Sequence, residues 1–332
     1  MTRRIGRFQS KPGIVCAGFW RLPYIAACPH QCAYCYLAGT YWRGLPRDLT
    51  EADLPEMQHE VERWMERTRC EVCDGSGEWC RACDAPSHGP VQDDATGGPC
   101  PVCKGTGGAI LNAGELSDSF APAISAELSL RLIEMFRAQD RHTLLLLTKA
   151  LPHRVLRKTE PTPQVILSFS LGQQRFCGQP LAGRGPTGEA LIAAAGELRA
   201  MGWRVRLRID PIIDRQGPEQ IERLLEKTPG PWERITLGSL RFTEATHRLM
   251  VLGTPLQHAL AGHLVARMEP DFGHHPWRLG THERVRLYRD IRERLAGCTD
   301  SWALCKETPD IWRLTFGADW PGHESVRCNC TP

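Results

Sequence analysis

Three cysteines near the N-terminus have the type and spacing that could bind an iron–sulfur cluster. Cys28, Cys32 and Cys35 lie in the segment Cys-Pro-His-Gln-Cys-Ala-Tyr-Cys-Tyr, so their spacing is C-x3-C-x2-C. Three thiolates from one tight loop can hold three irons of a [4Fe–4S] cluster and leave the fourth iron open to a substrate or cofactor. A structural zinc site usually closes with a fourth protein ligand. Zinc binding and chance spacing in a cysteine-rich chain are the alternatives to the cluster.

Residues 70–108 contain three C-x2-C pairs, and each pair can present two thiolates to one metal ion. The glycines after the first and third pairs let backbone N–H groups turn toward sulfur. We expect Zn²⁺ here, with the first and third pairs around one ion and the second pair completed by two further ligands, one of them His88. The first and third pairs resemble the CxxCxGxG repeats of DnaJ-type chaperone zinc domains. The metal in this insert either has a structural role, stabilising a loop that is too polar to fold alone, or the insert contacts a nucleic acid or protein. Its candidate ligands are Cys70, Cys73, Cys80, Cys83, Cys100 and Cys103.

Four further cysteines lie near the C-terminus, among several tryptophans. They are Cys298, Cys305, Cys328 and Cys330. One interpretation is that they bind an auxiliary iron–sulfur cluster or a second metal. Another is that Cys328-Asn-Cys330 is a mobile thiol pair that donates hydrogen or takes part in redox exchange. The third is that they are buried thiols without a role.

The composition limits the class of protein. A chain of 332 residues can bury one large core, or one core and a small module. A net charge of +3 neither demands nor excludes a nucleic-acid partner. The N-terminus lacks the apolar segment of a signal peptide, and the C-x2-C pairs favour metal binding in a reducing compartment. Because no apolar run is long enough to span a bilayer, we expect a cytoplasmic protein with no membrane partner. Its oligomeric state is left open.

Hydrophobic patterns predict strands that alternate with helices. This order is typical of a parallel sheet with right-handed crossovers, an α/β fold. The predicted strands are 18–25, 109–114, 142–148, 165–170, 203–209 and 235–237, and the predicted helices are 50–69, 122–138, 187–201, 219–226, 243–251 and 285–295. We divide the chain into a lead-in with the cluster loop (1–45), a helix with the zinc insert (46–108), the remaining barrel (109–254) and a C-terminal extension (255–332).

Polar side chains follow successive predicted strands, at the strand ends where active sites of parallel barrels lie. A carboxylate or hydroxyl there can accept a hydrogen bond from an ammonium group, and a lysine can meet a carboxylate. Each one alone is equally well a solvated loop residue. Their joint placement favours a binding site made of Glu115, Ser117, Asp118, Lys149, Ser168, Ser170, Arg208 and Asp210.

The C-x3-C-x2-C motif resembles that of the radical SAM enzymes. In that superfamily the open iron chelates S-adenosylmethionine (SAM), and an electron from the cluster cleaves it to a 5′-deoxyadenosyl radical. The resemblance implies a partial (β/α)6 barrel and an external electron donor such as flavodoxin or ferredoxin. It also implies that the loop after the second strand, with Glu115, receives the methionine amine, and that Lys149 suits the methionine carboxylate.

Several segments are similar to one branch, the spore photoproduct lyases. They are Cys28–Leu37, Ser-Asp-Ser119, Leu-Thr-Lys149, Leu-Ser-Phe-Ser170, Ile-Asp-Pro-Ile212 and Leu-Arg-Phe-Thr243. The resemblance implies hydrogen abstraction from a thymine dimer in DNA, with Tyr34 near the cofactor and Tyr36 near the substrate. One departure matters: where the lyases carry a hydrogen-donor cysteine, this chain has Glu115. Either Cys177 or a C-terminal cysteine such as Cys330 replaces it, or the reaction differs.

The substrate class therefore has alternatives. A nucleic acid, for repair or modification, is the favoured substrate, and the basic helix with Arg289, Arg292 and Arg294 could meet its phosphates. A solvated helix face explains these arginines equally well. The second hypothesis is a radical SAM enzyme on a small molecule or peptide, with a structural zinc module. The third is a zinc-dependent nucleic-acid or partner-binding protein without enzymatic activity.

Overall fold

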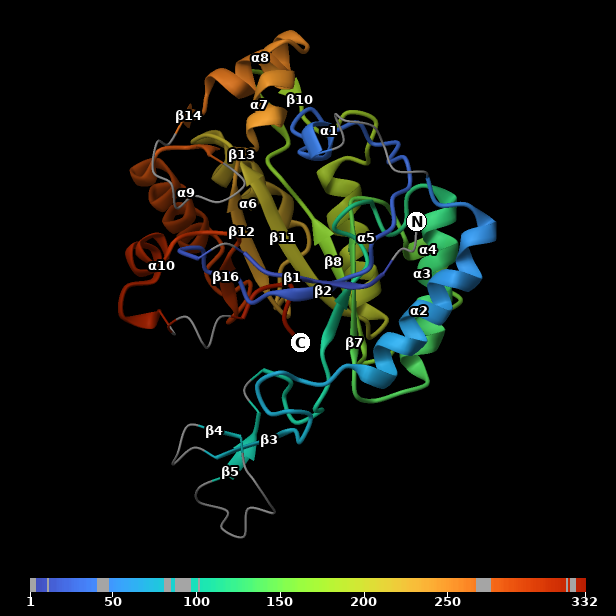
Figure 1. Ribbon diagram of the computed structural model, residues 1–332. Helices are drawn as coiled ribbons and strands as arrows, with labels where there is room; N and C mark the ends of the chain where they lie inside the picture. The colour runs from blue at the N-terminus through green and yellow to red at the C-terminus, as the bar shows by residue number, and fades with distance from the viewer. Residues whose placement is uncertain are drawn as a thin grey trace.

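An eight-stranded sheet forms the centre of the molecule, in the spatial order β1-β2-β6-β7-β8-β11-β12-β16. The pair β1–β2 is antiparallel, and every other neighbouring pair is parallel. The sheet curls into a half-barrel (Figure 1), which confirms the predicted partial barrel of alternating strands and helices. Its strands are β1 (Gly6–Phe8), β2 (Phe19–Arg21), β6 (Ile110–Asn112), β7 (Thr143–Thr148), β8 (Val165–Ser170), β11 (Arg204–Ile212), β12 (Ile235–Ser239) and β16 (Trp302–Leu304).

This structure is a computed structural model. It describes residues 4–10, 12–40, 48–80, 85–86, 97–100, 102–266, 276–320, 322 and 327–332.

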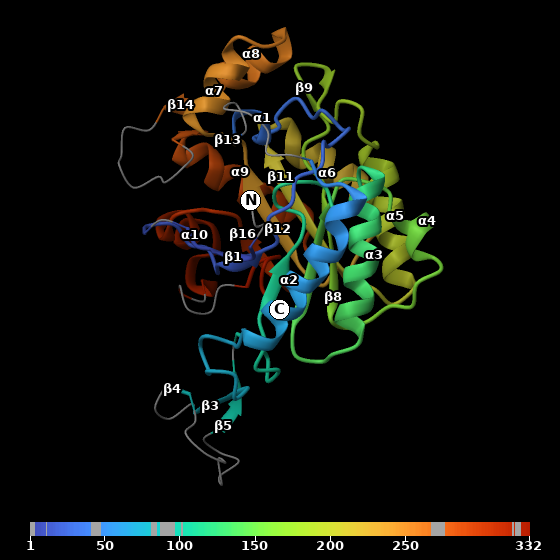
Figure 2. The same cartoon turned by 45° about the vertical axis from the view of Figure 1, so that its right-hand side comes forward.

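Helices pack around the outside of the half-barrel (Figure 2). Two short helices, α7 (Glu244–Val251) and α8 (Pro255–Gly262), stand with α1 (Leu37–Thr40) at one end of the sheet (Figure 1). Within the described part of the chain, no helix has the length and apolar character needed to cross a membrane. The outer helices are α2 (Leu54–Arg67), α3 (Ala123–Arg137), α4 (His153–Leu156), α5 (Gly188–Ala200), α6 (Gln216–Glu226), α9 (Thr281–Arg294) and α10 (Pro309–Phe316), with the short 3-10 helices η1 (Glu51–Asp53) and η2 (Gly317–Asp319).

Three small sheets lie outside the barrel. The one formed by β3 (Glu78–Cys80), β4 (Ala85–Pro86) and β5 (Gly97–Pro99) projects from the end opposite to α7 and α8 (Figure 1). It belongs to the cysteine-rich insert. The other two are the pair β9 (Arg175–Phe176) and β10 (Gln179–Pro180), and the set β13 (Arg241–Phe242), β15 (Trp277–Arg278) and β14 (Val265–Ala266).

The central strands are buried on both faces, as parallel strands covered by helices require. All six residues of β8 are buried, and β7 has one partly exposed position. Two of the outer helices begin at threonine caps: Thr187 accepts from the Ala190 N–H at the start of α5, and Thr243 accepts from the Thr246 N–H at the start of α7. Such caps satisfy backbone donors that the first helical turn leaves unpaired.

The C-terminal extension contributes a strand that the sequence did not predict. β16 pairs in parallel with β12, and Glu307 just beyond it forms an isolated bridge with Val15 from the N-terminal segment. β2 and β6 are equally short, but they lie within the longer apolar segments 18–25 and 109–114, whereas no such segment surrounds β16.

The segment 327–332 is held inside the half-barrel by the side chain of Asn329, which is fully buried. Its amide N–H group donates to the Ser168 hydroxyl at 2.9 Å and to the Leu207 carbonyl at 3.0 Å. Its amide oxygen accepts from the Thr236 hydroxyl at 2.8 Å. One side chain therefore ties the segment to three neighbouring strands, β8, β11 and β12.

We predict that Asn329→Ala destabilises the protein by about 2 to 4 kcal/mol, because it leaves buried hydroxyl and carbonyl groups without partners. Urea unfolding followed by circular dichroism measures the change. The matched control is Thr331→Ser, which keeps the hydroxyl that donates to the Cys328 carbonyl. A midpoint for Asn329→Ala equal to that of the wild type would contradict the proposed anchor.

Candidate functional site

The loop with the first cysteine motif follows β2 and is fixed by its backbone to the segment 181–184. The Ala33 N–H donates to the Leu181 carbonyl at 3.0 Å, and the Arg184 N–H donates to the His30 carbonyl at 2.7 Å. Gly183 has φ +60° and packs so tightly that a Cβ there would lie 2.3 Å from the Gln31 carbonyl oxygen. Only glycine fits such a position. The loop is thus held rigidly while its cysteine side chains remain partly accessible.

Cys28, Cys32 and Cys35 line one cavity of about 200 Å³. Three thiols around a cavity are the donors that a cluster with one open iron requires, so the residues present fit a [4Fe–4S] group. Burial raises the pKa of the Cys28 thiol to about 11, so a metal must displace its proton on binding. The other predicted site residues that line the same cavity are Tyr34, Tyr36, Glu115, Ser117, Asp118, Lys149, Ser170, Arg208, Asp210, Cys305 and Cys330.

Asp210 and its cationic neighbours dominate the electrostatics of the cavity. Burial alone would raise the pKa of Asp210, but the Arg241 guanidinium at 2.8 Å, with Arg208 and Lys149 nearby, holds it below its usual value. The carboxylate is therefore ionised at neutral pH and balances several positive charges. Arg241 is not among the predicted site residues, although it lies in the segment Leu-Arg-Phe-Thr243.

Lys149 lies between the cysteine loop and the end of β8. Its ammonium donates to the Ser170 carbonyl at 3.2 Å and lies 5.3 Å from the centre of the Tyr34 ring. Burial alone would lower the pKa of Lys149, but Tyr34, Cys32 and Asp210 raise it. A charged amine is thus held in the cavity beside the cysteine motif, where it can meet an anionic group of a bound molecule.

Asp118 positions the loops after β6 and β7. Its carboxylate accepts from the Thr148 hydroxyl at 2.7 Å and from the backbone N–H groups of Lys149 and Phe120 at 2.6 and 2.9 Å. His30, from the cysteine loop, lies 3.5 Å from the same carboxylate. Because these groups occupy its oxygens, Asp118 is better suited to holding Lys149 in place than to binding a cofactor directly.

The loop after β6 is also joined to the cysteine segment. The Tyr36 hydroxyl donates to the Glu115 carbonyl, and the Ser117 hydroxyl donates to the Ala26 carbonyl at 2.9 Å. The Glu115 carboxylate forms an ion pair with Arg21 at 3.4 Å. Segments from β2 and β6 are therefore cross-linked around the cavity.

Four predicted residues lie away from the cavity wall. Ser168 is buried under the cavity and bonds to Asn329, and Cys328 is buried behind Cys330. Cys177 is exposed in the turn between β9 and β10. Cys298 precedes β16, whereas Cys305 follows it, so these two cysteines lie at opposite ends of the sheet. Among the residues that the structure describes, the four C-terminal cysteines do not come together as a ligand set for one ion.

The arginines of the predicted basic helix, α9, contact other parts of the protein. The Arg289 guanidinium donates to the Leu314 carbonyl, and Arg292 donates to the Thr315 carbonyl at 2.9 Å. Arg294 is paired with Asp290 and Glu222, both at 2.6 Å. These arginines therefore join α9 to α10 and α6 through hydrogen bonds and an ion pair within the protein.

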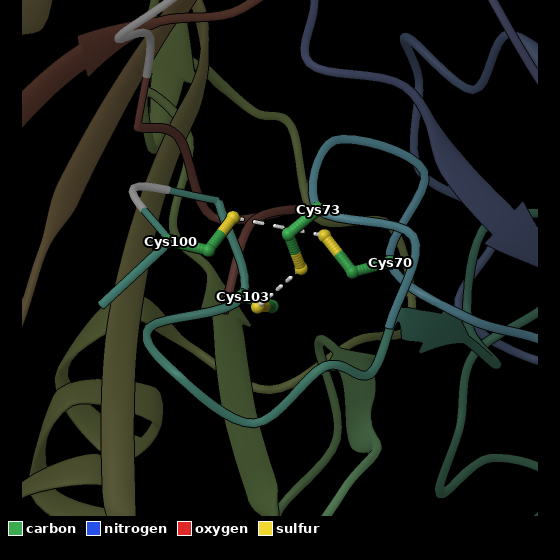
Figure 3. Close-up of side chains that lie close together, drawn as sticks. All are labelled: Cys70, Cys73, Cys100 and Cys103. Carbon is green, nitrogen blue, oxygen red and sulfur yellow. Dashed lines mark hydrogen bonds between the residues drawn. The ribbon is translucent and has the colours of Figure 1, made fainter. Parts of the chain in front are cut away.

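Four cysteines of the insert form a second site, away from the cavity. Cys70, Cys73, Cys100 and Cys103 are buried, and their sulfur atoms all lie within 4.8 Å of one another (Figure 3). The Gly77 N–H approaches the Cys73 sulfur and the Gly107 N–H approaches the Cys103 sulfur, each at 3.2 Å. The two knuckles are thus equivalent, and four thiols with N–H donors fit a tetrahedral metal such as Zn²⁺.

The second predicted zinc site is only partly described. Cys80 ends β3, while Cys83 and His88 lie outside the described residues. The proposed completion of that pair by His88 stays a prediction.

The structure also supplies site residues that the sequence did not suggest. Arg241, Lys306, Asn112 and His30 line the cavity, and Asn329 lies below it. Arg241 lies beyond the end of the predicted strand 235–237, Lys306 follows a strand that was not predicted, and no local pattern marks Asn329. His30 lies within the cysteine motif, which is the one signal that could have found it.

Comparisons with known proteins support the fold. No family model matches the chain, and no curated protein matches it. Its structure is similar to spore photoproduct lyase complexed with dinucleoside spore photoproduct (TM-score 0.56, 15% identity, 91% of this chain and 79% of the other). It is also similar to a double mutant of that lyase with bound AdoMet and the same dinucleoside (TM-score 0.58, 14% identity, 87% and 76%). A Cys-to-Ala mutant with the dinucleoside gives a TM-score of 0.55 at 15% identity, over 90% and 78%. The chain therefore has the partial barrel fold of spore photoproduct lyase.

Proposed function

We propose that the protein is a radical SAM enzyme whose reaction takes place in the cavity at the carboxyl end of the sheet. The observation that carries the proposal is that three thiols with C-x3-C-x2-C spacing line one cavity with the amine of Lys149, the carboxylate of Asp210 and a free thiol, Cys330. The shared fold supports it, because a lyase of that fold has been solved with bound AdoMet.

A [4Fe–4S] cluster on Cys28, Cys32 and Cys35 would supply the open iron and the electron that cleave SAM to a 5′-deoxyadenosyl radical. The protein's own residues bind and orient the cofactor. Lys149 is placed to meet the methionine carboxylate, and the loop of Glu115 and Ser117 is placed to receive the amine. Ser170, Arg208 and Asp210, which line the cavity, would support the cofactor from β8 and β11. Ser168 would act only indirectly, by holding Asn329 behind β8, and an external flavodoxin or ferredoxin would supply electrons. The cavity keeps water away from the radical.

The aromatic and thiol side chains have separate proposed roles. Tyr34 packs beside Lys149 and would lie near the cofactor, and Tyr36 would lie near the substrate. Of the two thiols considered as hydrogen donors, Cys330 lines the cavity, whereas Cys177 is exposed in the turn between β9 and β10 and does not line it. We therefore assign the donor role to Cys330 and not to Cys177.

We propose a nucleic acid as the substrate. The proposal rests on the dinucleoside held by lyases of the same fold and on the similar sequence segments. The arginines of α9 do not support it, because they are engaged within the protein. A small molecule or peptide remains the alternative substrate.

We propose that Cys70, Cys73, Cys100 and Cys103 bind one Zn²⁺ that stabilises the insert. The support is the buried tetrad of sulfur atoms with its two N–H donors. We also place the protein in the cytoplasm, since free thiols and metal-binding pairs belong to a reducing compartment.

The central test is the Cys32→Ala variant after anaerobic reconstitution. We expect the wild type to bind about four irons and to form 5′-deoxyadenosine from SAM with dithionite, and the variant to lose both. Iron and sulfide analysis and liquid chromatography measure the two quantities. Cys177→Ser is the control and should resemble the wild type. A wild type that binds zinc but no iron would contradict the proposal and leave the non-enzymatic binding protein.

The substrate class is tested with the dinucleoside spore photoproduct and with DNA that contains it. We expect either probe to be consumed and to increase 5′-deoxyadenosine formation, with an affinity for the DNA that falls as salt rises. Mass spectrometry of the nucleosides and fluorescence anisotropy of labelled DNA are the measurements. No consumption and no salt-dependent binding would exclude this nucleic acid and favour a small molecule or peptide.

The zinc proposal is tested with Cys100→Ser. We expect the wild type to contain about one tightly bound zinc and the variant to lose it, because three thiolates leave a structural site open. Metal analysis after dialysis, with limited proteolysis of the insert, measures the loss. Cys298→Ser, which leaves the tetrad intact, serves as control, and zinc retained in Cys100→Ser would overturn the assignment.

A further inference from the structure

Cys330 reaches the floor of the cavity from the segment 327–332. It lines the cavity although only 5% of its surface is exposed, and the Arg208 guanidinium lies 3.5 Å from its sulfur. Cys305, the other C-terminal thiol in the wall, is 3.4 Å from the Arg241 guanidinium. Cys330 therefore lines the same cavity as the cysteine motif, although the two lie near opposite ends of the chain.

Cys328 is the partner of Cys330 and does not line the cavity. The two thiols are hydrogen-bonded, and this bond, with Arg208 and Arg234 nearby, lowers the pKa of Cys328 to about 6. The same bond raises the pKa of Cys330. The two sulfurs therefore influence each other within one buried turn, and the direction of these shifts favours the thiolate at Cys328 and the thiol at Cys330.

The turn that joins the two sulfurs is anchored and not mobile. The Asn329 side chain bonds to β8, β11 and β12, and the Cys328 carbonyl accepts from Arg234 at 2.5 Å and from the Thr331 hydroxyl at 2.9 Å. Burial of Asn329 between two buried cysteines places both sulfurs on one fixed turn. This differs from the mobile thiol pair that the sequence alone suggested.

We propose that Cys328 and Cys330 form a dithiol–disulfide site that supplies a hydrogen atom to a radical in the cavity. The inference rests on the proposed function, because that function supplies the radical. It extends that function by pairing the hydrogen donor, Cys330, with a second thiol, Cys328. Cys330 is the catalytic residue, because it faces the substrate, and Cys328 acts through it.

The step balances in atoms and electrons. The S–H bond of Cys330 breaks, a C–H bond forms on the radical, and Cys330 is left as a thiyl radical. The thiolate of Cys328 joins it through a new S–S bond, and the extra electron leaves to an oxidised flavodoxin- or ferredoxin-type carrier. One thiol and one thiolate are oxidised to a disulfide, the radical gains one hydrogen atom, and the carrier gains one electron. A thiol reductant restores the pair for the next turnover.

The first experiment titrates the reconstituted holoprotein in anaerobic glutathione buffers, with acid quenching, alkylation and trypsin. Cleavage after Arg327 gives a peptide that begins at Cys328 and contains both thiols. In reducing buffers we expect this peptide to carry two alkyl groups. As the buffers become more oxidising, we expect it to change in one transition to a form with an internal disulfide. Cys328→Ser should instead leave Cys330 with bound glutathione, and Cys298→Ser should behave as wild type. Two free thiols throughout, or a disulfide from Cys328 to Cys16, would overturn the site.

The second experiment tests the hydrogen atom without a substrate. The holoprotein cleaves SAM in deuterated water, where the Cys330 thiol carries deuterium, and mass spectrometry counts deuterium in 5′-deoxyadenosine. We expect incorporation in the wild type and a lower deuterated fraction in the 5′-deoxyadenosine that Cys330→Ala forms. Unchanged incorporation in Cys330→Ala would overturn the donor role. If no 5′-deoxyadenosine forms in any variant, the proposed function has failed, and the glutathione titration then decides the dithiol site by itself.

Discussion

The partly buried ion pair between Asp210 and Arg241 is the interaction on which the cavity depends. An unpaired charge in a site of low dielectric costs several kcal/mol, so the carboxylate and the cations around it must be kept together. Arg208 and Arg241 contact the sulfurs of Cys330 and Cys305, while Lys149 contacts the cysteine loop through Tyr34. One carboxylate therefore balances the charges on both sides of the cavity, and the positions of the thiols and of the amine follow from it.

The sequence was informative where chemistry depends on local spacing. The C-x3-C-x2-C and C-x2-C motifs are short, so the chain alone places their thiols close together, and the structure gathers Cys70, Cys73, Cys100 and Cys103 as their spacing predicted. The six predicted strands and the helices between them also appear, because each carries its own apolar pattern. Carboxyl ends of parallel strands meet at one edge, which explains why residues as distant as Glu115 and Asp210 share a cavity.

The sequence was uninformative where a partner lies far along the chain. Nothing near Asn329 reveals that it bonds to Ser168, which is 161 residues away, and nothing near Cys16 reveals that it lies beside Cys328. No longer apolar segment surrounds β16, so the C-terminal extension was not expected to complete the sheet. The possible auxiliary metal site of the C-terminal cysteines shows the same limit. Cys298 and Cys305 are close in sequence, but β16 lies between them.

The central claim is that one cavity holds both an iron–sulfur cluster with an open iron and the SAM that the iron binds. Electron paramagnetic resonance of the reduced holoprotein, with SAM isotopically labelled at its amino nitrogen, tests it most directly. The account predicts a change in the cluster signal on adding SAM and a hyperfine coupling to the labelled nitrogen, and it predicts that Lys149→Met weakens SAM binding. A cluster signal that SAM leaves unchanged, without any coupling, would contradict the account.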